Sequence, residues 1–217
     1  MNTLEYILQK IDTNFEDKSP MPIEIPNVGR QTLASWLHEL DFKTGVEVGV
    51  AAGDYSAVIC QANPQMKLYG IDPYQPLAGY RDYTKPHTFQ KFREAAEAKL
   101  THFSNYQFIH KTSMEAANDF ADDSLDFVYI DANHAEPFIT EDITEWSKKI
   151  RLGGILAGHD YARPRSHDDM SPHHDVKSAV QGYTAKHHIK PWFVLGSWTF
   201  KKNEIRDNPR SWLWVKQ

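Results

Sequence analysis

Hydrophobic positions near the start of the chain follow the spacing of amphipathic helices. Apolar residues recur at intervals of three and four over 4–11, which is the stripe of one helical face. A segment with three prolines, 20–26, comes next, and we expect it to be a connector. A second stripe over 33–40 predicts another helix. The first part of the chain is therefore expected to be helical.

From residue 46 onward, short apolar runs alternate with helical patterns. The runs predict five strands, at 46–50, 67–71, 107–110, 125–130 and 153–158. The patterns between them predict four helices, at 54–62, around 88–100, at 113–120 and around 139–150. The run 125–130 is almost continuously apolar, which is typical of a strand covered on both faces. Repetition of strand, helix and strand predicts a parallel sheet with helices on both sides.

The end of the chain has a different pattern. Two aromatic-rich runs, 192–200 and 211–215, are joined by the polar segment 201–210. That segment is too short for a crossover helix, so we expect an antiparallel hairpin. The predicted fold class is α/β: a Rossmann-like, doubly wound sheet of seven strands, mostly parallel, with a C-terminal antiparallel hairpin. We expect one domain, 1–217, with 1–41 as an N-terminal helical extension.

Composition narrows the function classes. The chain has 217 residues, a net charge of −5, and no block of Lys or Arg, so a nucleic-acid partner is not expected. The single cysteine, Cys60, excludes an internal disulfide and favours a reducing compartment. The chain shows neither a signal-peptide pattern nor an apolar stretch of membrane-spanning length. We expect a cytoplasmic protein without a membrane partner; a homodimer is left open.

The turn after the first predicted strand carries the most informative motif, E-x-G-x-x-x-G, from Glu47 to Gly53. Gly49 and Gly53 allow a tight turn and let a ligand approach the backbone. The motif lacks the G-x-G-x-x-G spacing of dinucleotide sites, and Glu47 would repel a phosphate. A carboxylate there suits a ligand that carries an ammonium group and ribose hydroxyls. The plain alternative is an ordinary strand-to-helix turn with glycines that pack tightly.

Asp72 strengthens the interpretation as a nucleoside site. It ends the second predicted strand, where an acidic residue accepts hydrogen bonds from ribose hydroxyls in Rossmann-like sites. An Asp before Pro73 is also a common turn former. Two carboxylates at the ends of adjacent strands favour a neutral or cationic nucleoside.

Four segments together resemble a known family. They are EVGVAAGDYS, GIDPY, LDFVYIDANHAEPFITEDITEW and LGGILAGHDYARP, in this order along the chain. The series is similar to the class I S-adenosylmethionine-dependent methyltransferases, and most similar to the methyltransferase domain 24 group, with its macrocin O-methyltransferase and cephalosporin-hydroxylase-like relatives. The resemblance covers about 45–180 and implies a sheet closed by antiparallel strands. Ala51 stands where many class I enzymes have glycine.

The resemblance implies S-adenosylmethionine as the cofactor. Glu47, Gly49 and Gly53 would line its methionine and ribose end, and Asp72 would hold the ribose hydroxyls. Ser113 and Met114 would lie near the adenine. The complete set of residues expected at the cofactor is Glu47, Gly49, Gly53, Ser56, Asp72, Ser113, Met114 and Asp131.

The next two predicted strands end in residues that can bind a metal or move a proton. Asp131 and His134 follow one strand, and His159 and Asp160 follow the other. Ligands of open α/β sheets bind beyond the carboxyl ends of the strands, so these two tips should face one another. Carboxylates with imidazole can bind a divalent cation, which would lower the pKa of an acceptor hydroxyl. A histidine could instead take the acceptor proton directly.

In the sugar O-methyltransferases that the chain resembles, acidic residues at these strand ends hold magnesium. Carried over, the metal ligands would be Asp131, His159 and Asp160, with Mg²⁺ or another divalent cation. His159 stands where a second acid is often found, and Asn133 where an acidic candidate base often stands. The catalytic residues are then expected to be His134, as the base, and Asp131.

The sequence thus predicts an S-adenosylmethionine-dependent methyltransferase that acts on the hydroxyl of a small molecule or sugar, with a divalent metal as an open question. Two other functions stay open. One is a family member that binds the cofactor without methylating, either hydroxylase-like or an interaction subunit. The other is an NAD-type oxidoreductase on the same fold. The polar segment 163–175 is expected to form a flap over the acceptor.

Overall fold

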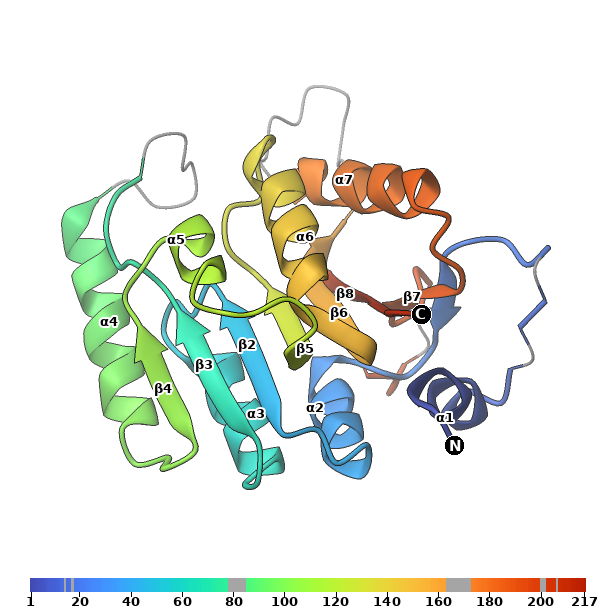
Figure 1. Ribbon diagram of the computed structural model, residues 1–217, viewed down its shortest axis with the longest axis horizontal. Coiled ribbons are helices and arrows are strands. Elements are labelled where there is room, and N and C mark those ends of the chain that lie inside the picture. The colour runs from blue at the N-terminus through green and yellow to red at the C-terminus, as the bar shows by residue number, and fades with distance from the viewer. Residues whose placement is uncertain (14, 17, 78–84, 163–172, 200–201, 206) are drawn as a thin grey trace.

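The computed structural model shows an eight-stranded sheet covered by helices (Figure 1). It describes residues 1–13, 15–16, 18–77, 85–162, 173–199, 202–205 and 207–217. The fold is α/β and Rossmann-like, as the sequence predicts. The sheet has one strand more than the predicted seven.

The additional strand lies in the segment expected to be a connector. The N-terminal elements are α1 (Thr3–Lys10), β1 (Ile23–Ile25) and α2 (Arg30–Glu39). β1 has three residues and pairs in parallel with β7 at the edge of the sheet. Prolines around it hid the strand from sequence reasoning, because proline is compatible with an edge strand but gives no periodic signal.

The predicted alternation of strands and helices is confirmed. The strands are β2 (Thr44–Val48), β3 (Lys67–Ile71), β4 (Tyr106–Ile109), β5 (Leu125–Ile130) and β6 (Ile150–Tyr161). The helices are α3 (Asp54–Ala62), α4 (Pro86–Leu100), α5 (Ser113–Ala117), α6 (Phe138–Lys149) and α7 (His173–Lys186). Most ends differ by a few residues from the prediction. Ile150, expected on the apolar side of a helix, opens β6, because a single isoleucine fits either pattern.

The predicted C-terminal hairpin is also confirmed. It consists of β7 (Trp192–Leu195) and β8 (Arg210–Val215), which pair antiparallel. β8 also pairs antiparallel with β6, so it lies between two strands of the opposite direction. The first strand is shorter than predicted and ends at Leu195.

The order of the strands shows where along the sheet a ligand is expected to bind. The order is β1-β7-β8-β6-β5-β2-β3-β4. The chain starts its parallel core at β2, adds β3 and β4 on one side, and then crosses to add β5 and β6 on the other. The direction of winding therefore reverses between β2 and β5. Open α/β sheets bind ligands beyond the carboxyl ends of the strands at this switch point.

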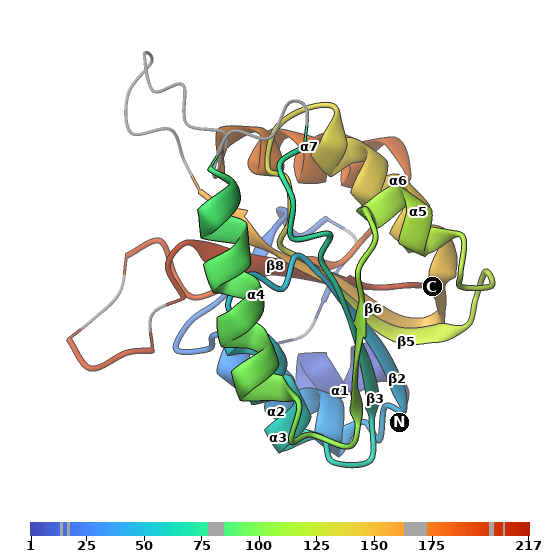
Figure 2. The same ribbon diagram turned by 90° about the vertical axis from the view of Figure 1, so that its left-hand side faces the viewer.

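Helices cover both faces of the sheet (Figure 2). Residues of α1, α2, α3 and α4 belong to one buried hydrophobic cluster, whose larger members include Trp36, Leu37 and Ile59. Residues of α5, α6 and α7 belong to a second cluster, which includes Trp146 and Val180. Because both faces are buried, a ligand can reach the sheet only at the ends of its strands.

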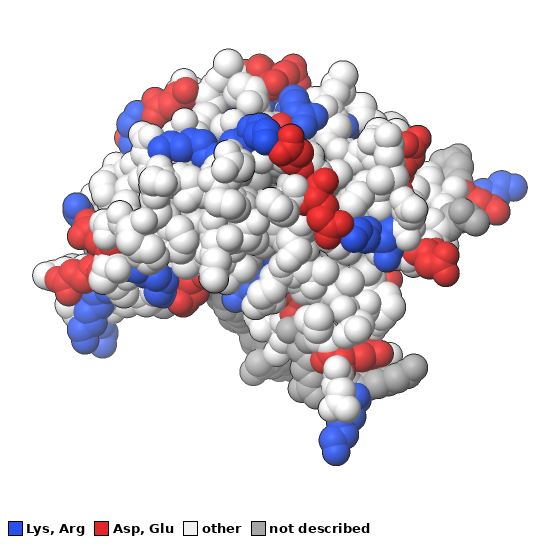
Figure 3. Space-filling model, turned by 90° about the horizontal axis from the view of Figure 1, so that it is seen from below, with Lys and Arg blue, Asp and Glu red and all other residues white. Residues whose placement is uncertain are grey.

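Charge is distributed without segregation on the face seen in Figure 3, where basic and acidic side chains lie intermixed around the rim. The balance agrees with the net charge of −5 over the whole chain. None of the helices in the described ranges combines the length and apolar character needed to span a bilayer.

Gly49, which follows β2, lies directly against the backbone of Asp131, which follows β5. Its φ of +93° is left-handed, and a Cβ at this position would lie 2.0 Å from the Asp131 carbonyl oxygen. The Asp131 amide in turn donates to the Val48 carbonyl at 2.7 Å. Only glycine satisfies both the backbone angle and the contact.

We expect Gly49→Ala to lower the free energy of unfolding by about 3 kcal/mol or more, since the clash and the left-handed backbone add. Urea denaturation measures this difference. Gly182→Ala is the control, because Gly182 lies in α7 and a Cβ added there would meet no neighbouring atom within 4 Å. There alanine should leave stability unchanged or raise it by about 1 kcal/mol. Equal stability of the Gly49 variant and wild type would contradict the role given to the contact.

Candidate active site

A cavity of about 820 Å³ opens at the carboxyl ends of the strands around the switch point. Its size lies within the range of small-molecule sites. Nine residues selected from the sequence line it: Glu47, Gly49, Asp72, Ser113, Met114, Asp131, His134, His159 and Asp160. The structure therefore brings the expected cofactor residues and the expected acceptor residues into one cavity.

Glu47 is buried at the end of β2. Only 2% of its surface is exposed, and the Ser56 hydroxyl donates a hydrogen bond to its carboxylate. Burial raises the pKa of Glu47 to about 8, and the Ser56 hydrogen bond opposes the rise. Glu47 therefore holds its proton to a higher pH than an exposed glutamate does.

Asp72 braces the glycine-rich turn. Its Oδ2 accepts hydrogen bonds from the amides of Val50 and Ala51, at 3.2 and 3.0 Å. Its Oδ1 accepts from the Tyr74 amide at 2.8 Å. Burial raises the pKa of Asp72, while these three amide hydrogen bonds work in the opposite direction. The carboxylate lines the cavity and shapes the turn beside it.

Gly53 and Ser56 are placed behind the cavity and are not among its lining residues. Gly53 has a φ of +76°, and a Cβ there would lie 2.7 Å from Leu100 of α4. Helix packing therefore requires this glycine. Ser56 is fully buried and contacts Glu47, so it acts on the cavity through that side chain.

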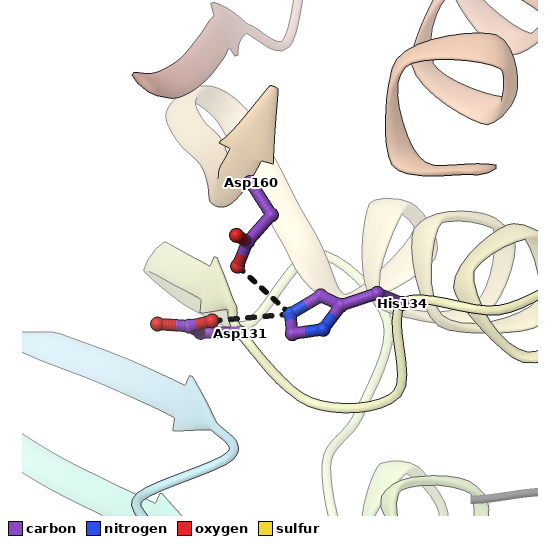
Figure 4. Close-up of side chains that lie close together, drawn as sticks. All are labelled: Asp131, His134 and Asp160. Carbon is purple, nitrogen blue, oxygen red and sulfur yellow. Dashed lines mark hydrogen bonds and ion pairs between the residues drawn. The ribbon is translucent and has the colours of Figure 1, made fainter. Parts of the chain in front are cut away.

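Asp131, His134 and Asp160 form a compact cluster (Figure 4). His134 Nε2 lies 3.3 Å from Asp131 Oδ1 and 3.0 Å from Asp160 Oδ2. One ligand atom from each residue lies within 4.8 Å of the others, a spacing at which the three could hold a metal ion. Asp160 is buried and has a φ of +58°, which aspartate adopts more readily than most residues.

His159 lies beside this cluster. Its Nδ1 is 3.1 Å from Asp160 Oδ2 and 3.8 Å from Asp131 Oδ2. Burial acts to lower the pKa of His159, but its hydrogen bond with Asp160 and the charges of the two aspartates outweigh burial and raise it. The three-residue cluster that the structure presents therefore contains His134 in the place where the sequence suggested His159 as a ligand.

The expected adenine end contains a carboxyl that sequence reasoning missed. Asp142 of α6 is buried, lines the cavity, and accepts a hydrogen bond from the Ser113 hydroxyl. Ser113 Oγ also accepts from Trp146 Nε1 at 2.9 Å. Burial raises the pKa of Asp142 to about 7. Asp142 follows no strand, so only the packing of α6 on α5 brings it to the site.

Arg30, the first residue of α2, also lines the cavity and was not selected from the sequence. Its guanidinium lies over the Tyr55 ring, 5.4 Å from the centroid, and its Nη1 is 3.9 Å from Asp131 Oδ2. The hydrophobic stripe of α2 predicts the helix but not which end of it reaches the sheet edge.

The predicted flap falls mostly outside the described residues, which exclude 163–172. Asp175, in the first turn of α7, accepts a hydrogen bond from the Glu136 amide at 3.1 Å. Its carboxylate therefore ties α7 to the segment that carries His134.

A family of methyltransferase domains matches residues 46–161, more than half of the chain. The matched segment runs from β2 to the end of β6 and includes the glycine-rich turn, Asp72 and the Asp131–His134–Asp160 cluster. The chain belongs to this family of methyltransferase domains.

Known proteins similar to the chain are distant. An uncharacterized protein of Acanthamoeba polyphaga mimivirus is 28% identical over 138 residues, which cover 62% of this chain and 58% of that protein. The match thus spans less than two thirds of the length of the viral protein. An O-methyltransferase from Bacillus cereus, in complex with S-adenosylhomocysteine, is similar in structure with a TM-score of 0.57 at 14% identity, covering 99% of this chain and 90% of that one.

A third similar protein is TomG from Streptomyces achromogenes, an O-methyltransferase involved in tomaymycin synthesis whose structure contains S-adenosylmethionine. Its TM-score is 0.57 at 13% identity, with 100% of this chain and 97% of that chain covered. At such identities, the two solved structures establish the fold. The expectation of a sheet closed by antiparallel strands is thereby confirmed.

The raised pKa of Glu47 predicts how stability depends on pH. Between its ordinary value of 4.5 and about 8, the folded protein holds a proton that the unfolded chain has lost. The stability contributed by this proton is fully present below the ordinary pKa of 4.5 and is lost as the pH rises through the folded-state pKa of about 8. Each unit of pKa difference corresponds to about 1.4 kcal/mol.

We expect Glu47→Gln to remove this loss, so that the free energy of unfolding falls less between about pH 5 and about pH 8.5 than in wild type. Urea denaturation at the two pH values measures the slope. Glu94→Gln, at an exposed position of α4, should keep the wild-type slope. A wild-type slope in the Glu47 variant would show that this carboxyl is not neutral in the folded protein.

Proposed function

We propose that this methyltransferase transfers the methyl group of S-adenosylmethionine to an oxygen atom of a small-molecule acceptor. The observation that carries the proposal is the single cavity that joins Glu47 and Asp72 on one side to the Asp131–His134–Asp160 cluster on the other. One side offers carboxylates to a cationic nucleoside, and the other offers groups that can orient and deprotonate a hydroxyl. O-methylation is also the activity named for TomG and for the Bacillus cereus protein.

On the cofactor side, Glu47 would face the ammonium group of the methionine part. Asp72 would accept hydrogen bonds from the ribose hydroxyls with the lone pairs that the turn amides leave unused. Ser113 and Met114 would contact the adenine, with Asp142 behind Ser113. Gly49 would keep the turn free of side chains where the ligand passes.

On the acceptor side, the cluster fits a divalent cation. Two carboxylates and one imidazole converge, and oxygen and nitrogen donors of this kind suit Mg²⁺ or Mn²⁺. A cation bound there would lower the pKa of an acceptor hydroxyl. His159, next to Asp160, would support the cluster through its 3.1 Å contact with that carboxylate.

The chain's own contribution to the reaction is position and proton removal. The methyl group moves from sulfur to the acceptor oxygen, the sulfur loses its positive charge, and the acceptor proton must leave. Where no cation occupies the cluster, His134 is the candidate base, since an imidazole commonly exchanges protons near neutral pH and Asp131 and Asp160 would stabilise the imidazolium that forms. Alignment of the methyl donor and the acceptor in one cavity would lower the remaining entropic part of the barrier.

The cofactor assignment is tested by calorimetric titration of the purified protein with S-adenosylhomocysteine and, in parallel, with NAD⁺. We expect the first to bind and the second not. Asp72→Asn should weaken binding of S-adenosylhomocysteine by about 1–3 kcal/mol, because a charged hydrogen-bond acceptor is lost. Asp119→Asn, at an exposed position paired with Lys111, should bind like wild type. Absence of binding at millimolar ligand would refute the cofactor assignment.

The acceptor assignment is tested at Asp131. Asp131→Asn should lower methyl transfer from isotope-labelled cofactor to hydroxylated acceptors by about 100-fold or more, since a bound cation would lose a charged ligand and, without a cation, the base His134 would lose its charged partner. Its affinity for S-adenosylhomocysteine should stay within a few-fold of wild type. Asp122→Asn, at an exposed position paired with Lys149, is the matched control.

Mn²⁺ titration of the same variants provides a readout independent of turnover. We expect wild type and Asp122→Asn to bind the ion, and Asp131→Asn to bind it about tenfold more weakly or worse. Turnover of Asp131→Asn at the wild-type rate would remove this residue from the reaction. Unaltered Mn²⁺ affinity would remove it from a metal site.

A further inference from the structure

Arg30 enters the cavity from outside the segment that matches the family. It opens α2, whereas the match begins at residue 46 in β2. The Tyr55 hydroxyl donates to the Arg30 carbonyl at 3.0 Å, and the Tyr55 ring lies beneath its guanidinium. Tyr55 is itself buried in α3 and packs on Tyr129 of β5, with ring centroids 4.5 Å apart. The arginine is thus held at a defined place in the cavity.

The guanidinium keeps its hydrogen-bonding capacity for a ligand. Within the described parts of the chain, its N–H groups donate no hydrogen bond to a side chain or to the backbone. Its approach to Asp131 Oδ2, at 3.9 Å, is an ion pair at the limit of contact. The side chain is about one third exposed, at 32%, and it lines the cavity. A guanidinium carries five donors in a planar fork that matches a carboxylate.

Arg30 is a basic residue in a cavity whose charged lining residues are mainly acidic. Seven carboxyl groups line it: Glu47, Asp54, Asp72, Asp131, Glu141, Asp142 and Asp160. Among the described lining residues, Arg30 is the only arginine or lysine. The charge of Arg30 acts on Glu47, the buried carboxyl at the end of β2. The cavity therefore presents a cation at the start of α2 and a buried acid at the end of β2.

We propose that Arg30 binds the carboxylate of an α-amino acid group, while Glu47 faces the ammonium of that same group. The chemistry is recognition of a zwitterion, in which the fork of a guanidinium takes the carboxylate in a bidentate manner. The inference rests on the proposed function, because it assigns this subsite to the methionine part of S-adenosylmethionine. It makes Arg30 a determinant of cofactor specificity that α2, which precedes the family segment, adds to the site.

A purely structural role for Arg30 predicts a different result. A structural arginine would be bonded to carboxylates or carbonyls, and its removal would lower stability without distinguishing one ligand from another. A carboxylate-binding arginine distinguishes ligands that differ only in the carboxylate. S-adenosylmethionine and its decarboxylated form are such a pair, since both retain the sulfonium, the ammonium and the nucleoside.

The experiment is calorimetric titration of the full-length chain with both ligands, for wild type, Arg30→Gln, Arg30→Lys and Arg93→Gln. We expect wild type to prefer S-adenosylmethionine by about tenfold or more, and Arg30→Gln to lose most of that preference. Arg30→Lys keeps the charge but not the fork, so it should be intermediate. Arg93→Gln, at an exposed position of α4 paired with Glu97, should behave as wild type. Thermal melting of each variant verifies that it is folded.

The outcomes separate this inference from the proposed function. If wild type binds S-adenosylmethionine and Arg30→Gln retains the full preference, the arginine does not bind the carboxylate and only the inference fails. If wild type binds both ligands equally, the carboxylate subsite is absent and the inference again fails alone. If wild type binds neither ligand, the cofactor assignment fails, and the inference with it.

Discussion

The contact between Gly49 and Asp131 is the constraint on which the site depends. With no Cβ at Gly49, the turn after β2 lies directly against the backbone at the end of β5, where the winding of the sheet reverses. This contact places the Glu47 side of the cavity next to the Asp131 cluster. A side chain at that point would push the two strand ends apart, and Glu47 and the Asp131 cluster would no longer share one cavity.

Acidic groups dominate this cavity, and the fold holds them at a cost. Burial disfavours the charged forms of Glu47, Asp72 and Asp142, and their pKa values rise. Such carboxyls are satisfied best when a cationic or hydrogen-bond-donating ligand enters. The cavity therefore suits a cationic or hydrogen-bond-donating ligand. Arg30 offsets this negative charge at one end only, so the two ends of the cavity differ in charge.

Several residues selected from the sequence because they follow a strand end line one cavity in the structure. Glu47, Asp72, Asp131 and Asp160 were all selected in this way, because the carboxyl ends of parallel strands meet at one edge of the sheet. Sequence reasoning did not find β1, whose three residues lie among prolines, nor Arg30 and Asp142, which face the cavity from helices. It gave Gly53 and Ser56 a place at the ligand, while the structure puts them behind the lining.

By itself, the sequence determined the alternation of elements, the parallel core with its terminal hairpin, and the acidic strand ends. These depend on local periodicity and on the motif spacing that a chain carries wherever it folds. Tertiary structure alone decided which ring nitrogen faces two aspartates, that His134 completes their cluster beside His159, and that the start of α2 reaches the cavity. Those outcomes depend on packing between segments far apart in the chain. Local periodicity of the sequence does not reveal which distant segments will be in contact.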